Sequence, residues 1–309
     1  MKLLCFLLLS FSVPIISENN DKILSNRENL RRHIVRLTST ESFRNFENIR
    51  TLNSAGDYIF DELKKTGLSP ERQRYSVRSK TVFNVNAEIK KSDSLKTILI
   101  GAHYDAAGNQ DGADDNASGT AGLLELARIL KSSEKSIHYN IIFSAFTLEE
   151  PPFFRTEQMG SYIHARSLFQ SGRKIDLMIS LEMIGYYSDQ ENSQEYPSFL
   201  MKPFYPSKGN FLAGTGRGKE KVWLKKILKA YEKYTDLPFE YLSTDLNISG
   251  TDFSDHLNYW KFNYPAIMIT DTSFLRNPNY HEQTDTVDTL DFSRMKKAVD
   301  GLYFFLSME

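Results

Sequence analysis

The sequence predicts an α/β domain in three layers, in which a mostly parallel, mixed β-sheet is flanked by helices. Segments with the apolar spacing of helices alternate along the chain with short apolar runs typical of strands. Several of these runs are apolar almost throughout, as buried strands are. After residue 20 neither a repeat nor a low-complexity linker interrupts the pattern, so we expect a single domain.

The first part of this domain contains two predicted helices and two predicted strands. Apolar residues recur with helical spacing over 29–37 and 53–65, and Gly67 ends the second helix. Residues 72–77 and 82–89 then alternate between apolar and polar side chains, as strands with one exposed face do.

Four apolar segments that follow are candidates for the central strands, and four helices lie among them. The strand candidates are 97–102, 140–147, 177–184 and 264–270. The helix candidates are 117–130, 160–169, 219–234 and 292–306. In the third of these helices a row of lysines lies opposite a stripe that includes Trp223 and Ile227. We expect the lysine row to be a solvated face rather than an anion site.

The composition excludes several classes of function. Lys and Arg total 38 and Asp and Glu total 39, so the chain carries no excess of positive charge that would favour nucleic acid as a partner. The one cysteine, Cys5, rules out an internal disulfide and every zinc site built from cysteines. A metal ion would therefore have to be held by His, Asp and Glu.

The first 17 residues predict a signal peptide. Lys2 precedes a mostly apolar run over 3–16, which is too short and too interrupted for a comfortable membrane span. An uncleaved anchor and a buried helix are the alternatives. Cleavage near Ser17 would leave one catalytic domain over 18–309, without cysteine and without stable insertion in a membrane. Such a chain is typical of a secreted or periplasmic enzyme of a bacterial cell envelope.

Acidic and imidazole side chains follow the predicted central strands, close to where each strand ends. They are His103, Asp105, Asp114, Asp115, Glu149, Glu150, Glu182 and His281. In open α/β sheets ligands bind outside the carboxyl ends of the strands. We therefore expect these residues to meet in one crevice, although they are spread over about 180 residues of the chain.

The adjacent acids Glu149 and Glu150 are hard to explain as ordinary loop charges. Two carboxylates that leave the core together repel each other and lose solvation, and Asp114 with Asp115 repeats the problem in another loop. Divalent cations would offset this cost. Histidine and carboxylate ligands without cysteine suit zinc.

These motifs, in this order, resemble the dizinc aminopeptidase family of metallopeptidases, which also includes glutaminyl-peptide cyclases and glutamate carboxypeptidase-like enzymes. The motifs are His103-x-Asp105, GADDNASG at 112–119, Glu149-Glu150, LEMIG at 181–185, and Tyr280-His281 with Asp285 after it. The resemblance extends from about Leu30 to the C-terminus and implies the three-layer fold of zinc exopeptidases.

The resemblance also implies a role for each matching residue. His103 and Glu182 would bind one zinc ion, Glu150 and His281 the other, and Asp115 both. Two zinc ions per chain are therefore expected. Glu149 would be the general base, and Asp105 would orient the imidazole of His103. Asp114 is expected to order its loop rather than to touch metal.

Two departures from the family pattern bear on the site. Glu182 stands where better known aminopeptidases often have Asp, which leaves Asp189 as a rival ligand that we consider weaker. Bulky residues at 151–155 replace small ones and are expected to shape the substrate pocket. His256 is a further candidate for a place in that pocket.

The favoured function is that of an aminopeptidase, which hydrolyses the N-terminal residues of peptides. A water held between the zinc ions would lose its proton to Glu149 and attack the scissile carbonyl. One alternative is a glutaminyl-peptide cyclase, a single-zinc acyltransferase on the same scaffold. A carboxypeptidase or dipeptidase is another. An inactive binding module is a third, although the retention of Glu149 and of all five ligand candidates argues against it. The sequence makes no prediction of oligomeric state.

Overall fold

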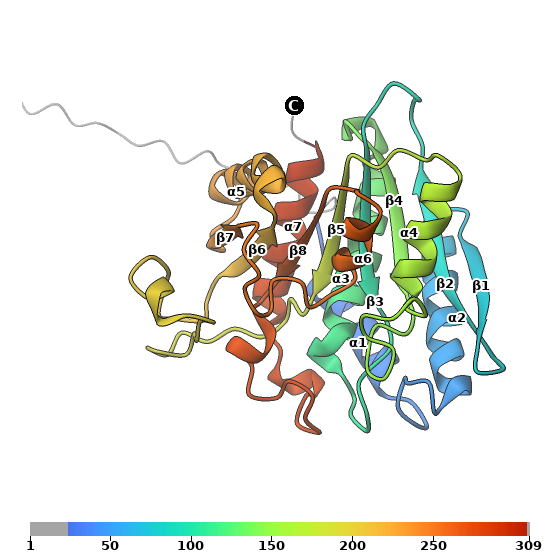
Figure 1. Ribbon diagram of the computed structural model, residues 1–309, viewed down its shortest axis with the longest axis horizontal. Coiled ribbons are helices and arrows are strands. Elements are labelled where there is room, and N and C mark those ends of the chain that lie inside the picture. Colours follow the sequence, from blue (N-terminus) through green and yellow to red (C-terminus); the bar gives the residue numbers. More distant parts are fainter. Residues whose placement is uncertain (1–23, 308–309) are drawn as a thin grey trace, which may run out of the picture.

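The computed structural model describes residues 24–307 and has the predicted three layers (Figure 1). Its middle layer is an eight-stranded sheet with the order β1-β2-β4-β3-β5-β8-β6-β7. The strands are β1 (Glu71–Val77), β2 (Lys80–Ile89), β3 (Thr97–His103), β4 (Asn140–Phe146), β5 (Leu177–Glu182), β6 (Leu212–Gly216), β7 (Phe239–Ser243) and β8 (Ala266–Thr270). The helices are α1 (Arg27–Thr38), α2 (Ile49–Lys65), α3 (Gly119–Ser132), α4 (Gly160–Gln170), α5 (Lys221–Tyr234), α6 (His256–Lys261) and α7 (Phe292–Ser307).

The sheet is mixed and mostly parallel, which confirms the predicted fold class. Strands β3, β4, β5 and β8 run parallel to their neighbours in the centre, and β6 runs parallel to β7. Antiparallel pairing occurs between β1 and β2, between β2 and β4, and between β6 and β8. The ends of β3, β4 and β5 therefore lie at one edge of the sheet, where the predicted site residues occur.

Helices cover both faces of the sheet. Helices α1, α2, α3, α5 and α7 share the larger apolar core on one face, and α4 with α6 packs on the other face (Figure 1). Because successive side chains of a strand point to opposite faces, Met178 of β5 enters the smaller core and Ile179 enters the larger one. In α5 the residues Trp223 and Ile227 are buried, and the lysines opposite them are exposed as expected.

The predicted central strands are present with small shifts at their ends. Strand β5 stops at Glu182, two residues before the predicted end, because the next two backbone N–H groups leave the ladder. The N–H of Met183 donates to Oδ1 of Asn116 (3.0 Å), and that of Ile184 donates to Oγ of Ser118 (2.9 Å). These side chains fasten the end of β5 to the turn that carries Asp115.

Three elements of the structure were not predicted from the sequence: β6, β7 and α6. The predicted signal peptide over 1–17 lies outside the described residues, so the signal peptide remains a prediction. Within residues 24–307, no helix combines the length and the apolar character needed to cross a membrane.

Candidate metal centre and substrate pocket

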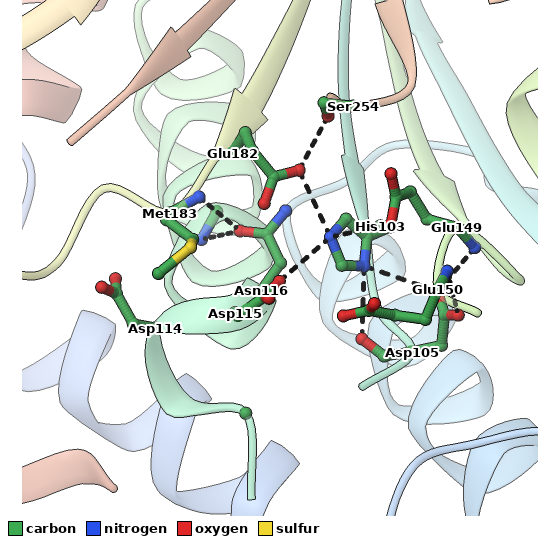
Figure 2. A network of polar contacts seen from close by, with 12 residues as sticks. His103, Asp105, Asp114, Asp115, Asn116, Glu149, Glu150, Glu182, Met183 and Ser254 are labelled. Atoms are coloured by element: carbon green, nitrogen blue, oxygen red, sulfur yellow. Dashed lines mark hydrogen bonds and ion pairs between the residues drawn. The ribbon is translucent and has the colours of Figure 1, made fainter. Parts of the chain in front are cut away.

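The five predicted ligands and Glu149 come from five separate segments and meet at one edge of the sheet. Figure 2 labels all of them except His281. His103 is the last residue of β3 and Glu182 the last residue of β5. Glu149 and Glu150 follow β4, Asp115 lies in a short helical turn over Ala113–Ser118, and His281 lies in the loop after β8. All of them except His281, which remains partly accessible, are buried.

The Asp115 carboxylate lies between the two histidines. Its Oδ1 is 3.4 Å from Nε2 of His103, and its Oδ2 is 3.1 Å from Nε2 of His281. Each histidine has a second carboxylate partner: Oε2 of Glu182 is 3.3 Å from Nε2 of His103, and Oε2 of Glu150 is 3.3 Å from Nε2 of His281. The cluster is therefore two His–Glu pairs that share one aspartate.

Each His–Glu pair together with Asp115 has the dimensions of a metal site. In both groups the candidate ligand atoms lie within 4.8 Å of one another. A third group, of His103 with Glu149 and Glu150, meets the same limit, but Nε2 of His103 is farther from Glu149 (3.9 Å) than from Glu182. We prefer the two groups that share Asp115 because together they use all five predicted ligands. Asp189 is not a rival, because it is exposed and pairs with Arg294 at 2.7 Å.

Asp105 lies behind the cluster and contacts three of its parts. Its Oδ1 is 3.5 Å from Nδ1 of His103, and this nitrogen is 3.2 Å from the backbone carbonyl of Asp105. The two carboxylate oxygens also accept hydrogen bonds from the backbone N–H groups of Glu149 and Glu150, both at 3.1 Å. Asp105 thus lies where it can contact the imidazole of His103, and it also anchors the Glu149–Glu150 segment to β3.

The turn that carries Asp115 is held by two further acidic side chains, those of Asp114 and Asp285. The carboxylate of Asp285 accepts hydrogen bonds from the backbone N–H groups of Asp114 (2.8 Å) and Asp115 (3.0 Å). Asp114 is directed away from the metal ligands (Figure 2), and its Oδ1 accepts from the N–H of Gly185 at 2.9 Å. This arrangement agrees with the expectation that Asp114 orders its loop.

Burial and the proximity of other charged groups shift the pKa values of the acids and histidines in the cluster. Burial raises the pKa of Glu149 well above its usual range, and it raises that of Glu150 to about 8, with the Asp115 charge adding to the shift. Burial alone would lower the pKa of His281, but its contacts with Asp115 and Glu150 raise it to about 10. Conversely, burial opposes ionisation of Asp115, yet the two histidines lower its pKa. The cluster therefore favours positive charge at its centre.

Two residues next to the cluster were not singled out from the sequence. The hydroxyl of Ser254 donates to Oε2 of Glu182 at 2.7 Å and so holds that ligand. Asp255 is fully buried near the cluster, and burial raises its pKa to about 7. The sequence pointed instead to His256. This residue does not line the pocket, and its Nε2 lies 2.9 Å from the carbonyl of Thr251.

A pocket of about 280 Å³ opens beside the cluster. Asp115, Glu149, Glu150, Glu182 and His281 lie at one side of it. Its remaining walls are largely apolar and aromatic, and they include Phe154, Tyr196, Met201, Tyr205, Phe211, Leu242, Phe253, Met268 and Phe274. Phe154 belongs to the bulky segment that was expected to shape the pocket. The space suits a side chain held next to the metal ligands.

Comparison with known proteins decides the family. The model of peptidase family M28 matches residues 84–305, which is most of the domain. The chain belongs to peptidase family M28. Its relatives include the uncharacterized protein YfbL of Escherichia coli, which is 41% identical over 287 residues covering 90% of this chain and 87% of that protein. Leucine aminopeptidase 1 of Paracoccidioides brasiliensis is 25% identical over 302 residues, covering 91% and 71%.

Solved structures of M28-like enzymes share the fold. The LapA aminopeptidase of Legionella pneumophila superposes with a TM-score of 0.72 at 19% identity, covering 97% of this chain and 77% of that one. A glutaminyl cyclase of Bacteroides thetaiotaomicron superposes with a TM-score of 0.69 at 18% identity, covering 93% and 99%. The predicted family is confirmed, and the protein is a metallopeptidase of the hydrolase class. M28 enzymes depend on zinc, and the buried His, Asp and Glu groups fit a metal ion.

Proposed function

We propose that this M28 peptidase is an exported aminopeptidase that uses two zinc ions to remove N-terminal residues from peptides. The observation that carries the proposal is the placement of Asp115, whose two carboxylate oxygens face the two histidines at 3.4 and 3.1 Å. A carboxylate in this position can be shared by two cations. Export rests on the signal peptide predicted over 1–17.

The residues of the cluster fit zinc in number and kind. His103, Glu182 and Asp115 would hold one ion, and His281, Glu150 and Asp115 would hold the other. Within the described residues, Oε1 of Glu150 is buried without a hydrogen-bond partner, as expected of an oxygen that would coordinate a metal ion. Zinc in such a site would polarise a carbonyl and make water more acidic.

Glu149 is the proposed general base and acid. Its backbone is anchored by Asp105, and its Oε2 lies 3.9 Å from Nε2 of His103, at the edge of the metal groups. Its carboxylate would accept a proton from the attacking water and then deliver this proton to the leaving amine. Burial raises the pKa of Glu149, which suits a group that must hold a proton between the two steps.

A glutaminyl-peptide cyclase is the second candidate. The solved cyclase of Bacteroides thetaiotaomicron has nearly all of its length (99%) in common with this chain, so nothing in the size of the domain separates the two activities. An aminopeptidase and a glutaminyl cyclase would differ in the walls of the pocket and in the number of zinc ions that each requires. A carboxypeptidase or dipeptidase activity would require a group that binds a free substrate carboxylate.

A substrate panel tests the proposal. Aminoacyl amides, C-terminally free dipeptides and a peptide with N-terminal Gln are incubated with the protein, with chelator and with chelator followed by zinc. We expect hydrolysis of aminoacyl amides that chelator abolishes and zinc restores. Ring closure of the Gln peptide without hydrolysis of any amide would support the cyclase instead. Cleavage restricted to substrates with a free carboxylate would contradict both.

A further inference from the structure

One row of residues runs straight across the sheet from the metal ligands to the far side of the pocket. In the strand register Glu182 pairs with Thr270, Thr270 with Ala213, and Ala213 with Glu240. Residues directly opposite each other on neighbouring strands point to the same face of a sheet. All four residues line the pocket. The pocket floor therefore begins at a metal ligand and ends at a glutamate on β7.

Glu240 is the one acidic residue of the pocket wall that the metal cluster does not use. The other four acids, Asp115, Glu149, Glu150 and Glu182, are the candidate ligands and the candidate base. Glu240 is half-buried, and burial raises its pKa. Within residues 24–307 it has neither an ion pair nor a hydrogen bond, and the pocket wall contains no Lys and no Arg.

Two tyrosines beside Glu240 have hydroxyl groups that bond to backbone carbonyls rather than to Glu240. The rings of Tyr196 and Tyr205 are stacked with centroids 5.7 Å apart. The Tyr196 hydroxyl donates to the carbonyl of Pro206 (2.6 Å), and that of Tyr205 donates to the carbonyl of Tyr241 (3.2 Å). Both tyrosines are close enough to Glu240 for its charge to add to the rise in pKa that burial causes. A carboxylate beside aromatic faces is an environment that attracts a cation.

We propose that the pocket selects substrates whose N-terminal residue has a long basic side chain, lysine or arginine, and that Glu240 is the residue that determines this specificity. The inference rests on the proposed aminopeptidase function. The stem of such a side chain would lie along the apolar walls, and its charged end would meet Glu240, which otherwise has no counter-ion in the pocket.

The dimensions of the row agree with a long side chain. Neighbouring strands lie about 4.8 Å apart, so three strand spacings place Glu240 roughly 14 Å from Glu182 along the sheet. A substrate residue held beside the ligands would cover about half of this distance with an extended lysine or arginine side chain, and the Glu240 side chain together with the hydrogen bond between the two charged groups would cover the remainder. A leucine side chain would leave the far part of the pocket empty and the carboxylate unpaired.

The test compares substrates that differ only at the end of the side chain. Amides of lysine, arginine and norleucine are assayed with the zinc-loaded full chain, since norleucine keeps the methylene stem without the ammonium group. We expect kcat/KM for the lysyl amide to exceed that for the norleucyl amide by tenfold or more. In Glu240→Gln this ratio should fall by about tenfold to a hundredfold, as expected for loss of a hydrogen bond between charged groups.

Glu195→Gln is the matched control, because it removes the same charge nearby from an exposed side chain that pairs with Lys202 and does not line the pocket. The lysyl-to-norleucyl ratio should be the same in this variant as in the wild type. A wild-type ratio at or below one, or a ratio that changes by less than about twofold in Glu240→Gln, would overturn the specificity and leave the aminopeptidase function standing. Hydrolysis of none of the amides would overturn both.

Discussion

Glu149 and Glu150 are adjacent in the sequence, yet the structure gives them different surroundings. Oε2 of Glu150 contacts His281 at 3.3 Å, as expected of a metal ligand, whereas Glu149 stands 3.9 Å from His103 and makes no contact as short with either histidine. The order of the two residues therefore matters: the second completes a candidate metal group with Asp115 and His281, the first lies next to that group, and both line the pocket. This difference predicts different outcomes when each is replaced.

Replacing Glu149 by Gln should leave metal binding close to that of the wild type and lower kcat by a hundredfold or more. The amide keeps the size of the side chain but cannot take the proton from water at neutral pH. Zinc content per chain and kcat for an aminoacyl amide are the two measurements. Glu157→Gln, an exposed residue of the following loop, is the control and should keep full activity. Unchanged turnover in Glu149→Gln would contradict its assignment as the base.

The residue types and their order could be predicted from the sequence, and so could the supporting positions of Asp105 and Asp114, whereas other supporting contacts could not. The ligand candidates stand in short motifs at the ends of apolar strands, so they can be recognised in the sequence. Asp285 stands in one of the family motifs, but its contact with the backbone at Asp115, like that of Ser254 with Glu182, joins residues far apart in the sequence and is encoded by no local pattern. Only the folded chain brings these partners together.

At the level of elements, the loops of the site are fastened by one buried arginine. Arg44 lies between α1 and α2 and is almost completely buried. Its guanidinium donates to the backbone carbonyls of Tyr104 (3.0 Å), Leu37 (3.1 Å) and Gly112 (2.8 Å), and also to that of Asp111. These carbonyls belong to the end of α1, the end of β3 and the segment just before the Asp115 turn.

Replacing Arg44 by Lys should lower the free energy of unfolding by about 2–4 kcal/mol, because an ammonium group cannot reach all of these carbonyls and leaves buried acceptors unpaired. We also expect weaker zinc binding, since the Asp115 turn loses an anchor. Urea unfolding and zinc titration measure the two effects. Arg31→Lys serves as the control, because Arg31 is exposed and its ion pair with Asp288 is long (3.9 Å). Equal stability of the Arg44 and Arg31 variants would contradict this role.

Two of the three elements that escaped prediction, β6 and β7, form part of the pocket. Strand β6 (LAGTG) has two glycines among five residues, and β7 (FEYLS) is short and mixed in polarity at the edge of the sheet. Neither has the apolar run that made the central strands visible. The sequence therefore indicated the metal ligands but gave no sign of Glu240, whose importance depends on the register of β7 against β6.

The whole molecule explains how a nearly neutral chain contains a strongly acidic site. The formal net charge is −1, with basic residues distributed over exposed faces such as that of α5. Three parallel strands, β3, β4 and β5, deliver their acidic end segments to the same edge of the sheet. Parallel order is what makes residues far apart in the sequence converge, and this much followed from the predicted fold class. The antiparallel pairing of β6 with β8, which extends the pocket floor to Glu240, did not follow from the predicted fold class.

The most direct test of the two-zinc account is to titrate zinc into chelator-treated protein while the hydrolysis of an aminoacyl amide is followed. Asp115→Asn, which replaces the carboxylate that both ions would share by a neutral amide, provides the comparison. We expect activity to rise until two equivalents of zinc are bound per chain, and Asp115→Asn to bind zinc poorly and remain almost inactive. Full activity at one equivalent, or the same titration in Asp115→Asn, would contradict a centre of two zinc ions organised around Asp115.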